Sequence, residues 1–407
     1  MPAGVRCPPQ YGCAQEYGAG VDLDARLTVL GSLNMDISVT VPALPDPGAT
    51  VLGDAAVIAP GGKGANQAVA AARLAAGSGI AVRMVGCVGD DDFGRSLRAA
   101  LRREGVRDES VRTVPGVPTG IAMITVDQAG ENVITVAPGA NREVGPAEIG
   151  AVKAGAPGVG ATEAGAARAG AGVAEPGAAG AGAAGRPGGA SGVLVISAEV
   201  PVAAILAALS PRDAAASDAA ASDAAVGGAA GEGRRQVRGN GAGPRPLTVL
   251  NLAPAPAEAA DLVAAAPDWL IVNESEAGAA LGRPVRGLTQ AVRAAADLVA
   301  AGARHAVVTA GAAGTAYHAG RVEGSKPAGG TVAAFPVHAL DTVGAGDTFV
   351  GALAVALAAG IAPEEAITAA SAAAATAVTR RGTQDGMPRP ADVRAVTGYA
   401  WPLPAAK

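Results

Sequence analysis

Asp341-Thr-Val-Gly-Ala-Gly-Asp-Thr-Phe349 is the stretch on which the interpretation of this chain depends, and an alanine-rich, helix-forming run follows it. The small residues Gly344, Ala345 and Gly346 allow backbone N–H groups to converge on one point. We expect a helix to begin near Asp347 and to direct the positive end of its dipole at that point. This arrangement predicts an anion hole suited to a phosphoryl group during transfer, with Asp347 placed as a general base. The alternative is a glycine turn in which Asp347 only caps the helix.

The composition excludes several classes of protein. The 407 residues suffice for one large domain or two, and with only 2% aromatic residues the core must be built from Ala, Val, Leu and Ile. A net charge of −5, without blocks of like charge, argues against nucleic-acid or membrane-surface binding. No apolar run approaches the roughly 20 residues of a transmembrane helix. Cys7, Cys13 and Cys87 form no metal cluster with the sparse histidines, and their count fits a reducing, cytosolic location.

Three segments lack the pattern of a folded core. Residues 1–25 contain Pro, Gly and both acids without a compact apolar signal core, and we interpret them as a disordered extension. Between about 144 and 192, and again between about 213 and 246, the chain is mostly Ala and Gly, with too few large apolar residues to offset the entropy of ordering. These two stretches are predicted to be surface insertions within one domain of about 26–396, which a tail at 397–407 follows.

The rest of the chain alternates apolar strands with helical runs. Strands are expected at the start of the domain and at 82–88, 193–197, 247–251, 269–272 and 306–309, with helices between several of them. This order predicts an α/β fold of three layers, in which helices cover both faces of a central, mostly parallel sheet. Strand-like excursions at about 37–58 and 120–136, the second a good hairpin signal, predict a small second sheet beside it.

Short polar side chains gather where strands or turns end. Asn34 and Asp36 follow the first strand, while Lys63 and Asn66 follow a glycine-rich turn. Such a set suits a polyhydroxylated ligand, although Asn34 and Asp36 could simply cap a turn. Gly61-Gly-Lys-Gly64 is not a Walker motif, because that motif requires Gly-x-x-x-x-Gly-Lys-[Ser/Thr]. The GxGxxG dinucleotide fingerprint is also absent, which disfavours a nicotinamide enzyme.

Three later features each have a functional and a structural interpretation. Glu199 follows a buried strand and could bind a sugar hydroxyl, or it is a solvated loop acid. Asn273 and Glu276 could place an acid near a phosphate to hold Mg²⁺ through water, or they form the capped first turn of a helix. The turn Thr309-Ala-Gly-Ala-Ala-Gly314 is flexible enough to pass under a nucleotide.

Taken together, the motifs resemble the PfkB-type carbohydrate kinases, and within that family the ribokinase group. The resemblance runs in family order over about 26–396, outside the two insertions, and rests on these stretches: Gly31–Asp36, Gly61–Arg73, Gly86–Gly94, Asn251–Ala255, Asn273–Glu276, Asp341–Gly351 and Ala377–Gln384. The Asp341–Gly351 stretch is typical of the whole family, and Gly-Gly-Lys-Gly-Ala-Asn-Gln-Ala narrows it to the ribokinase group.

The resemblance implies ATP-dependent phosphorylation of D-ribose at its 5-hydroxyl. Asp347 would be the base, and Gly344, Ala345 and Gly346 would form the anion hole. The sugar would be bound by Asn34, Met35, Asp36, Gly62, Lys63, Gly64, Ala65, Asn66, Glu199 and Asp347. The nucleotide would be bound by Asn273, Thr309, Ala310, Gly311, Ala312, Ala313, Gly314, Gly346 and Ser371. Glu276 would hold Mg²⁺ through water.

The resemblance also implies a potassium-type activating ion and a homodimer. The ion would bind beside the anion hole at Asp341, Val343, Ala377, Arg380 and Gly382. The family often has a serine where Gly386 stands, so a ligand is lost there or is replaced by water or Asp385. The small sheet would close over the sugar as a lid, excluding water, and would also contact the partner subunit.

Two other functions stay open at this point. One is a kinase of the same family for another small sugar or a nucleoside, such as a fructokinase. A nucleoside kinase would be expected to carry apolar or aromatic lid residues for the base, and the lid region has almost no aromatic residues. The other is a non-catalytic sugar-binding regulator, which the presence of Asp347 and its glycines disfavours.

Overall fold

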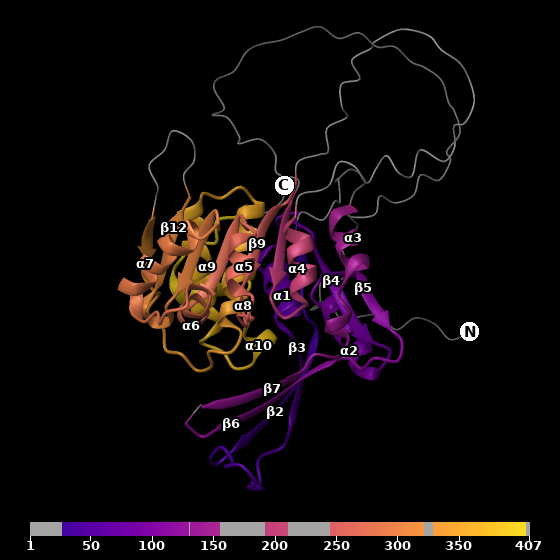
Figure 1. Cartoon of the computed structure of the whole chain (residues 1–407). Coiled ribbons are helices and arrows are strands. Elements are labelled where there is room, and N and C mark those ends of the chain that lie inside the picture. Colours follow the sequence, from indigo (N-terminus) through magenta and orange to yellow (C-terminus); the bar gives the residue numbers. More distant parts are fainter. Residues whose placement is uncertain (1–26, 130, 155–191, 211–244, 321–328, 404–407) are drawn as a thin grey trace, which may run out of the picture.

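The computed structural model describes residues 27–129, 131–154, 192–210, 245–320 and 329–403, which form a layered body with a small sheet projecting from it (Figure 1). The expected N-terminal extension and most of both expected insertions lie outside the described residues. No helix within the described ranges is long and apolar enough to cross a membrane.

A nine-stranded sheet forms the centre of the body. In spatial order its strands are β13 (Gly329–Val332), β12 (Thr315–Ala319), β11 (His305–Thr309), β10 (Trp269–Asn273), β9 (Leu247–Asn251), β8 (Val193–Ser197), β1 (Leu27–Leu30), β4 (Val82–Gly89) and β5 (Arg107–Val114). The strands from β11 to β5 are parallel, and β12 pairs antiparallel with both β11 and β13 at one edge. The α/β class with a mostly parallel sheet is therefore confirmed.

Helices cover both faces of this sheet, as the alternation of elements predicts. One core layer includes residues of α1 (Lys63–Leu74), α2 (Asp92–Arg103), α8 (Ala345–Ala358), α9 (Pro363–Ala377) and α11 (Pro390–Thr397). The other includes residues of α3 (Pro146–Ala154), α4 (Val202–Leu209), α5 (Ala259–Ala264), α6 (Glu274–Leu281) and α7 (Gly287–Ala300). The first layer is rich in alanine, and small residues let helices approach closely: a Cβ at Gly351 of α8 would stand 2.7 Å from the carbonyl oxygen of Gln67 in α1.

The small sheet has the strand order β3-β2-β6-β7, formed by β3 (Val57–Gly61), β2 (Asn34–Val41), β6 (Gly120–Asp127) and β7 (Asn132–Ala137). β2 pairs in parallel with β6, and β6 and β7 form the expected hairpin. This sheet extends below the body in Figure 1, and β2 is its first strand in the sequence. The two excursions of the sequence thus meet in one sheet.

Several boundaries differ from the sequence prediction. The chain from Val144 was expected to be part of an insertion, but α3 is ordered there because Ile149 and Val152 are buried in the core and Glu148 binds Arg112, with 2.6 Å between Glu148 Oε1 and Arg112 Nε. Within the strand-like excursion expected at about 37–58, β2 ends at Val41 and β3 begins only at Val57.

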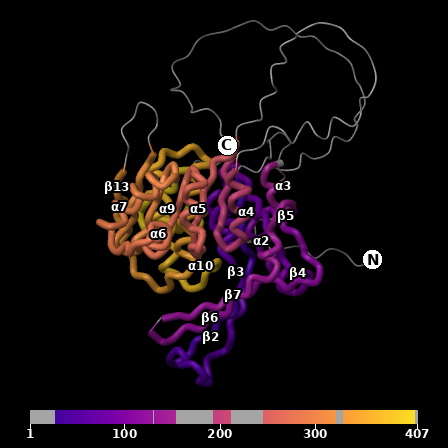
Figure 2. Tube along the Cα trace, viewed as in Figure 1, coloured from indigo at the N-terminus to yellow at the C-terminus, as the bar shows by residue number. Residues whose placement is uncertain are grey.

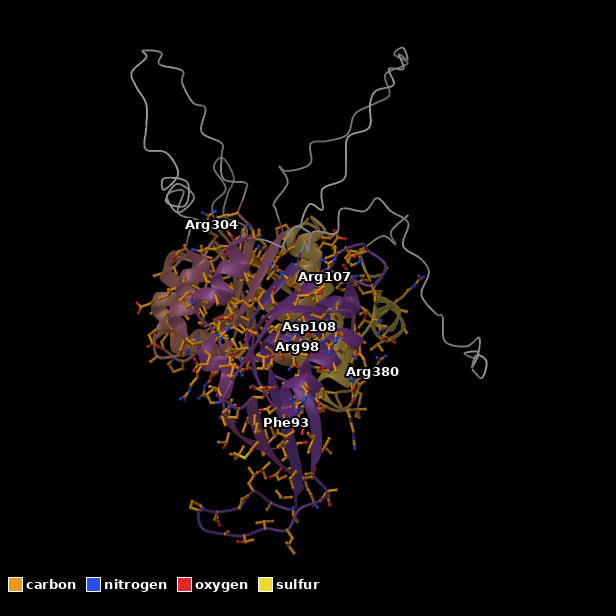
Figure 3. The ribbon with its side chains drawn as sticks, turned by 90° about the vertical axis from the view of Figure 1, so that its right-hand side faces the viewer. Phe93, Arg98, Arg107, Asp108, Arg304 and Arg380 are labelled. Carbon is orange, nitrogen blue, oxygen red and sulfur yellow. The ribbon has the colours of Figure 1, made fainter. Side chains whose placement is uncertain are left out.

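The strand β5 was not predicted, because its charged residues obscure the apolar pattern. The salt bridges of Asp108 attach this edge strand to α2: its Oδ2 lies 2.7 Å from Arg98 Nε and 2.8 Å from Arg102 Nη1. Asp108 is 5% exposed, and Figure 3 labels it beside Arg98. A buried carboxylate with two guanidinium partners has its charge compensated.

Candidate active site

The helix that carries Asp347 begins two residues earlier than predicted. α8 starts at Ala345, and Gly344 is its N-cap, with φ 78°. A Cβ at Gly344 would also stand 2.8 Å from Thr383 Cγ2, so both the backbone and the space there require glycine. Asp347 is therefore in the first turn and does not cap the helix. The N–H groups of Gly346 and Asp347 belong to that first turn and have no intrahelical acceptor, as an anion hole requires.

The carboxylate of Asp347 is buried and held by two side-chain amides. Its Oδ2 accepts a hydrogen bond from Asn66 Nδ2 at 3.0 Å, and its Oδ1 accepts one from Gln67 Nε2 at 3.0 Å. Gln67 Nε2 also donates to Asn251 Oδ1 at 2.9 Å, and Gln384 Nε2 donates to Asn66 Oδ1 at 3.0 Å. These bonds fix the carboxylate at the N-terminus of α8, with its orientation set by α1.

Three members of this network were not predicted to be functional residues. Gln67, Asn251 and Gln384 all lie within motifs that carry the family resemblance. Their position in those motifs was the available signal, but a single amide side chain has many structural uses. Only the fold shows that residues 184 and 318 positions apart in sequence bind each other in one network around the Asp347 carboxylate.

Lys63 lies among four acidic side chains. Its N–H donates to Glu199 Oε2 at 3.2 Å, and its Nζ lies 3.9 Å from Glu199 Oε1. Burial acts to lower the pKa of Lys63, but the charges of Asp347, Glu199, Glu276 and Asp36 raise it above its ordinary value. The structure thus brings together residues that were predicted separately to bind the sugar, to hold Mg²⁺ and to act in catalysis.

Asp36 has the most perturbed carboxyl group of this cluster. Burial, followed by the charges of Glu199 and Asp347, raises its pKa to about 7, and Lys63 acts in the opposite direction. Within the described part of the chain this carboxyl group accepts no hydrogen bond from another residue. Asp36 is therefore available to a ligand that brings its own donors, such as sugar hydroxyl groups.

Some of the residues predicted to bind the sugar have side chains that are buried in the protein and do not face the site. Met35 alternates with Asn34 and Asp36 along β2 and is buried in the core, as is Ala65. Asn34 is 2% exposed, and its Oδ1 accepts a hydrogen bond from Asn141 Nδ2 at 2.8 Å.

Steric limits explain why glycine stands at two of the positions predicted to bind the sugar. A Cβ at Gly62 (φ 87°) would stand 2.6 Å from the backbone nitrogen of Asn34, and one at Gly64 would stand 2.6 Å from the carbonyl carbon of Gly31. These glycines let the start of α1 lie against the segment that follows β1.

The predicted nucleotide residues lie at the ends of neighbouring strands. Asn273 and Thr309 are register partners at the ends of β10 and β11. Asn273 caps α6 in a capping box with Glu276, so the pair does form the capped first turn of a helix, and this geometry leaves a role toward a ligand open. Burial raises the pKa of Glu276, and Asp347 adds to the effect, against the Asn273 N–H and Lys63. The turn Thr309–Gly314 contains the short 3₁₀ helix η3 (Gly311–Ala313), whose residues are exposed.

Ser371 lies apart from these two strand ends, on α9. Its Oγ is buried and has no hydrogen-bond partner within the described chain. An unpaired hydroxyl group of this kind can accept or donate one bond to a ligand.

The residues predicted for the monovalent ion converge around Asp341. Its Oδ1 accepts from the N–H of Val343 at 3.0 Å, and its Oδ2 accepts from the N–H of Gly382 at 2.9 Å. A Cβ at Gly386 would stand 3.4 Å from the carbonyl oxygen of Ala377 and 3.6 Å from that of Arg380. A carboxylate and backbone carbonyls are hard oxygen donors, as an alkali cation requires. The described residues contain no cluster of three or more His, Cys, Asp or Glu side chains that could hold a metal ion.

Comparison with known proteins shows the family of this chain. The model of the pfkB family of carbohydrate kinases matches residues 24–155 and 238–390. This chain belongs to that family. It is a sugar kinase, a phosphotransferase, with the ribokinase-like fold and its small lid sheet.

Its relatives include several ribokinases. The chain is 31% identical to ribokinase of Haemophilus influenzae over 89% of its own length and 95% of the relative, and 29% identical to that of Schizosaccharomyces pombe over 89% and 94%. Among solved structures, ribokinase of Arabidopsis thaliana complexed with ribose and ATP has a TM-score of 0.64 and 25% identity, covering 92% of this chain and 99% of the other. Ribokinase of Thermotoga maritima has a TM-score of 0.63 and 27% identity, covering 91% and 98%.

Proposed function

We propose that this sugar kinase transfers the γ-phosphoryl group of ATP to the 5-hydroxyl of D-ribose, giving D-ribose 5-phosphate for carbohydrate metabolism. The observation that carries the proposal is the meeting of Asp347, at the start of α8, with the acids around Lys63 at the start of α1. The ribose and ATP bound by the Arabidopsis ribokinase support the choice of substrates.

In this proposal the chain supplies position and electrostatics. Asp347 takes the proton of the 5-hydroxyl as that oxygen attacks the γ-phosphorus, and the bond to the β-phosphate oxygen breaks to release ADP. The N–H groups of Gly346 and Asp347, in the first turn of α8, stabilise the charge on the transferred group, while the N–H of Ala345 donates to the carbonyl oxygen of Thr342. Asp36, Lys63 and Asn66 hold the sugar, and closure of the lid keeps water from competing as the acceptor. Asn273, the Thr309–Gly314 turn and Ser371 line the nucleotide.

Two cations are part of the same proposal. Glu276 would hold Mg²⁺ through water, because both its oxygens already accept from Asn273 at 2.8 and 3.0 Å. Bound Mg²⁺ would neutralise charge on the phosphates. Potassium would bind at Asp341 and the carbonyl groups around Gly386. Neither ion takes a proton in the reaction.

A homodimer formed through the lid is also proposed. The lid carries large apolar side chains that are at least half exposed, which a partner would cover: Val57, Ile58, Met123, Val133 and Ile134. The oligomeric state in solution tests this, and a monomer at micromolar concentration would contradict it. The cytosolic location stays a prediction from the sequence.

The test of the function is ADP release with D-ribose, fructose and adenosine in parallel, with and without potassium. Turnover selective for ribose is the expected result. Turnover only with another acceptor would keep the kinase and overturn the substrate, and ribose binding without turnover of any acceptor would favour a regulator.

Asp347→Asn tests the base. This variant should still bind ribose and ATP, but its kcat should fall roughly 10²–10⁴-fold, which is the usual contribution of a general base. Because both oxygens of Asp347 accept from amides, Asp347→Ala serves as a second variant without a new donor. Asp261→Asn, at an exposed position of α5, is the control. Near wild-type turnover of both Asp347 variants would exclude Asp347 as the base.

A further inference from the structure

Gln384 connects a short helix to the amide that touches the reacting carboxylate. It lies in α10 (Thr383–Gly386), next to β3 and the base of the lid (Figure 2). Its Nε2 donates to Asn66 Oδ1 at 3.0 Å, and Asn66 Nδ2 donates to Asp347 Oδ2 at 3.0 Å. An amide side chain has one acceptor end and one donor end, so the first bond decides which end of Asn66 faces Asp347.

The backbone of α10 is anchored on two sides. Arg73 of α1 donates through Nη1 to the carbonyl oxygens of Gln384 and Met387, the latter at 2.9 Å. Arg73 is itself held by Glu104, with 2.8 Å both from Nε to Oε2 and from Nη2 to Oε1. On the other side, the N–H of Gly382 donates to Asp341 Oδ2. Gln384 therefore extends from a fixed backbone, which is what a side chain needs if it is to set the orientation of another.

The opposite orientation of Asn66 would be unfavourable. It would direct Oδ1 toward the carboxylate of Asp347, so that two acceptor oxygens would face each other in a buried site. In the orientation observed, one hydrogen of the Asn66 NH₂ group binds Asp347, and the second has no acceptor among the described residues and can bind a ligand hydroxyl group. The same amide can then contact both the base and the atom from which the base takes a proton.

We propose that Gln384 is a positioning residue for phosphoryl transfer: it holds the Asn66 amide with its NH₂ group toward Asp347 and the acceptor hydroxyl. This inference rests on the proposed function. It assigns Gln384 a role that does not require contact with either substrate, and it makes α10 part of the catalytic framework.

The test compares two substitutions of similar size. Gln384→Glu replaces the donor by an acceptor and favours the reversed Asn66 amide, whereas Gln384→Leu leaves that amide without a partner. We expect kcat with ribose to fall roughly 10–100-fold in Gln384→Glu, the cost of one unfavourable buried polar contact, and several-fold less in Gln384→Leu. The KM for ATP should stay within about twofold in both, since neither substitution touches the nucleotide residues.

A purely structural role would give a different order. Gln384→Leu would then lower kcat at least as much as Gln384→Glu does, and kcat and both KM values would change together. The control is Gln290→Glu on α7, where the side-chain oxygen already serves as an acceptor for the N–H of Arg286 at 3.0 Å, so the same change of charge keeps its bond. Wild-type kcat in Gln384→Glu, or an equal loss in both variants, would overturn the inference.

A second measurement does not depend on activity. The losses of Tm in Gln384→Leu and Asn66→Leu should be non-additive, with the double variant losing clearly less than the sum, because both single variants break the same bond. Additive losses would overturn the inference even if the enzyme phosphorylates ribose. If the wild type phosphorylates no sugar, the proposed function fails, and the Tm cycle still tests whether Gln384 and Asn66 are coupled.

Discussion

The carboxyl group of Asp36 lies directly over the α-carbon of Gly61: a Cβ at Gly61 would stand 2.1 Å from Asp36 Oδ2 and 2.3 Å from Asp36 Cγ. Gly61 is the last residue of β3, and its register partner Asn34 lies two residues before Asp36 on β2. The side chains of a strand alternate, so Asn34 and Asp36 share a face, and Asp36 leans along that face into the space where Gly61 has no side chain.

Gly61→Ala should therefore displace the Asp36 carboxylate. Real atoms do not approach to 2.1 Å, so the side chain must leave its position, and we expect the KM for ribose to rise at least tenfold while the KM for ATP changes little. Steady-state kinetics with each substrate varied in turn measures this. In the double variant Asp36→Ala, Gly61→Ala the steric conflict is gone, so its Tm should exceed that of Gly61→Ala although ribose affinity stays low. Unchanged ribose KM in Gly61→Ala would contradict the placement of Asp36.

Ribose affinity should depend on pH through Asp36. Burial, Glu199 and Asp347 raise its pKa to about 7, and the ionised form is the better acceptor for sugar hydroxyls. The Kd for ribose should be nearly constant well above pH 7 and should rise about tenfold for each pH unit below that. Calorimetric titration between pH 5 and 9, with Asp36→Asn as the variant that loses the dependence, measures it. A flat profile in the wild type would contradict the prediction.

The raised pKa of Asp36 affects the stability of the fold in the opposite direction to ribose binding: stability falls as pH rises. Because the folded pKa of Asp36 lies above the ordinary value of 3.8, the folded state binds more protons between those values. The contribution of Asp36 to stability is therefore present below about pH 4 and is lost as pH rises toward 7. A carboxyl group that destabilises the free enzyme at neutral pH is typical of a site that binds a ligand there.

The sequence predicted the parts of the fold that depend on local pattern. Strands β8 and β9 have the predicted bounds, because short apolar runs flanked by polar residues or glycine are local signals. Helix α3 was missed, since its Ala-rich sequence resembles the stretch that follows it. Its order comes from Ile149 and Val152, which fill the core beside distant strands.

For the candidate site too, the sequence predicted what local motifs indicate and not the contacts between distant residues. Asp347, Lys63 and Asp36 stand in motifs whose residue types already indicate their chemistry. The bonds of Gln67 to Asn251 and of Gln384 to Asn66 join residues far apart in sequence, and no periodicity reports such pairs. The N-cap position of Gly344 is another example, because only the turn geometry moves the helix start from residue 347 to residue 345.

Gly344→Ala should damage the anion hole. The residue has φ 78°, and the added Cβ would stand 2.8 Å from Thr383 Cγ2, so the turn must shift away from α10. We expect kcat to fall by about 10²-fold or more, as when an oxyanion donor is misplaced. Gly360→Ala, at the other end of α8, is the matched control: its φ is 77°, and within the described part of the chain no atom lies within 4 Å of the added Cβ. It bears the same backbone strain, of roughly 1–2 kcal/mol, and should keep its kcat. Equal kcat losses in the two variants would mean that strain alone, and not the hole, explains the effect.

Gly386→Ser should strengthen binding of the monovalent ion. The added Cβ would stand 3.4 Å from the carbonyl oxygen of Ala377 and 3.6 Å from that of Arg380, which is ordinary contact, and φ of Gly386 is not in the left-handed region. A serine hydroxyl can therefore join the carbonyl groups that would bind the ion. One added oxygen ligand contributes about 1 kcal/mol, a roughly fivefold decrease in the potassium concentration for half-maximal activation. Turnover measured against potassium at saturating ribose and ATP tests this, with Gly150→Ser on α3, where no atom of the described residues lies within 4 Å of the added Cβ, as the control. An unchanged half-maximal concentration in Gly386→Ser would place the ion away from Gly386, and a turnover independent of potassium in both proteins would remove the ion from the proposed function.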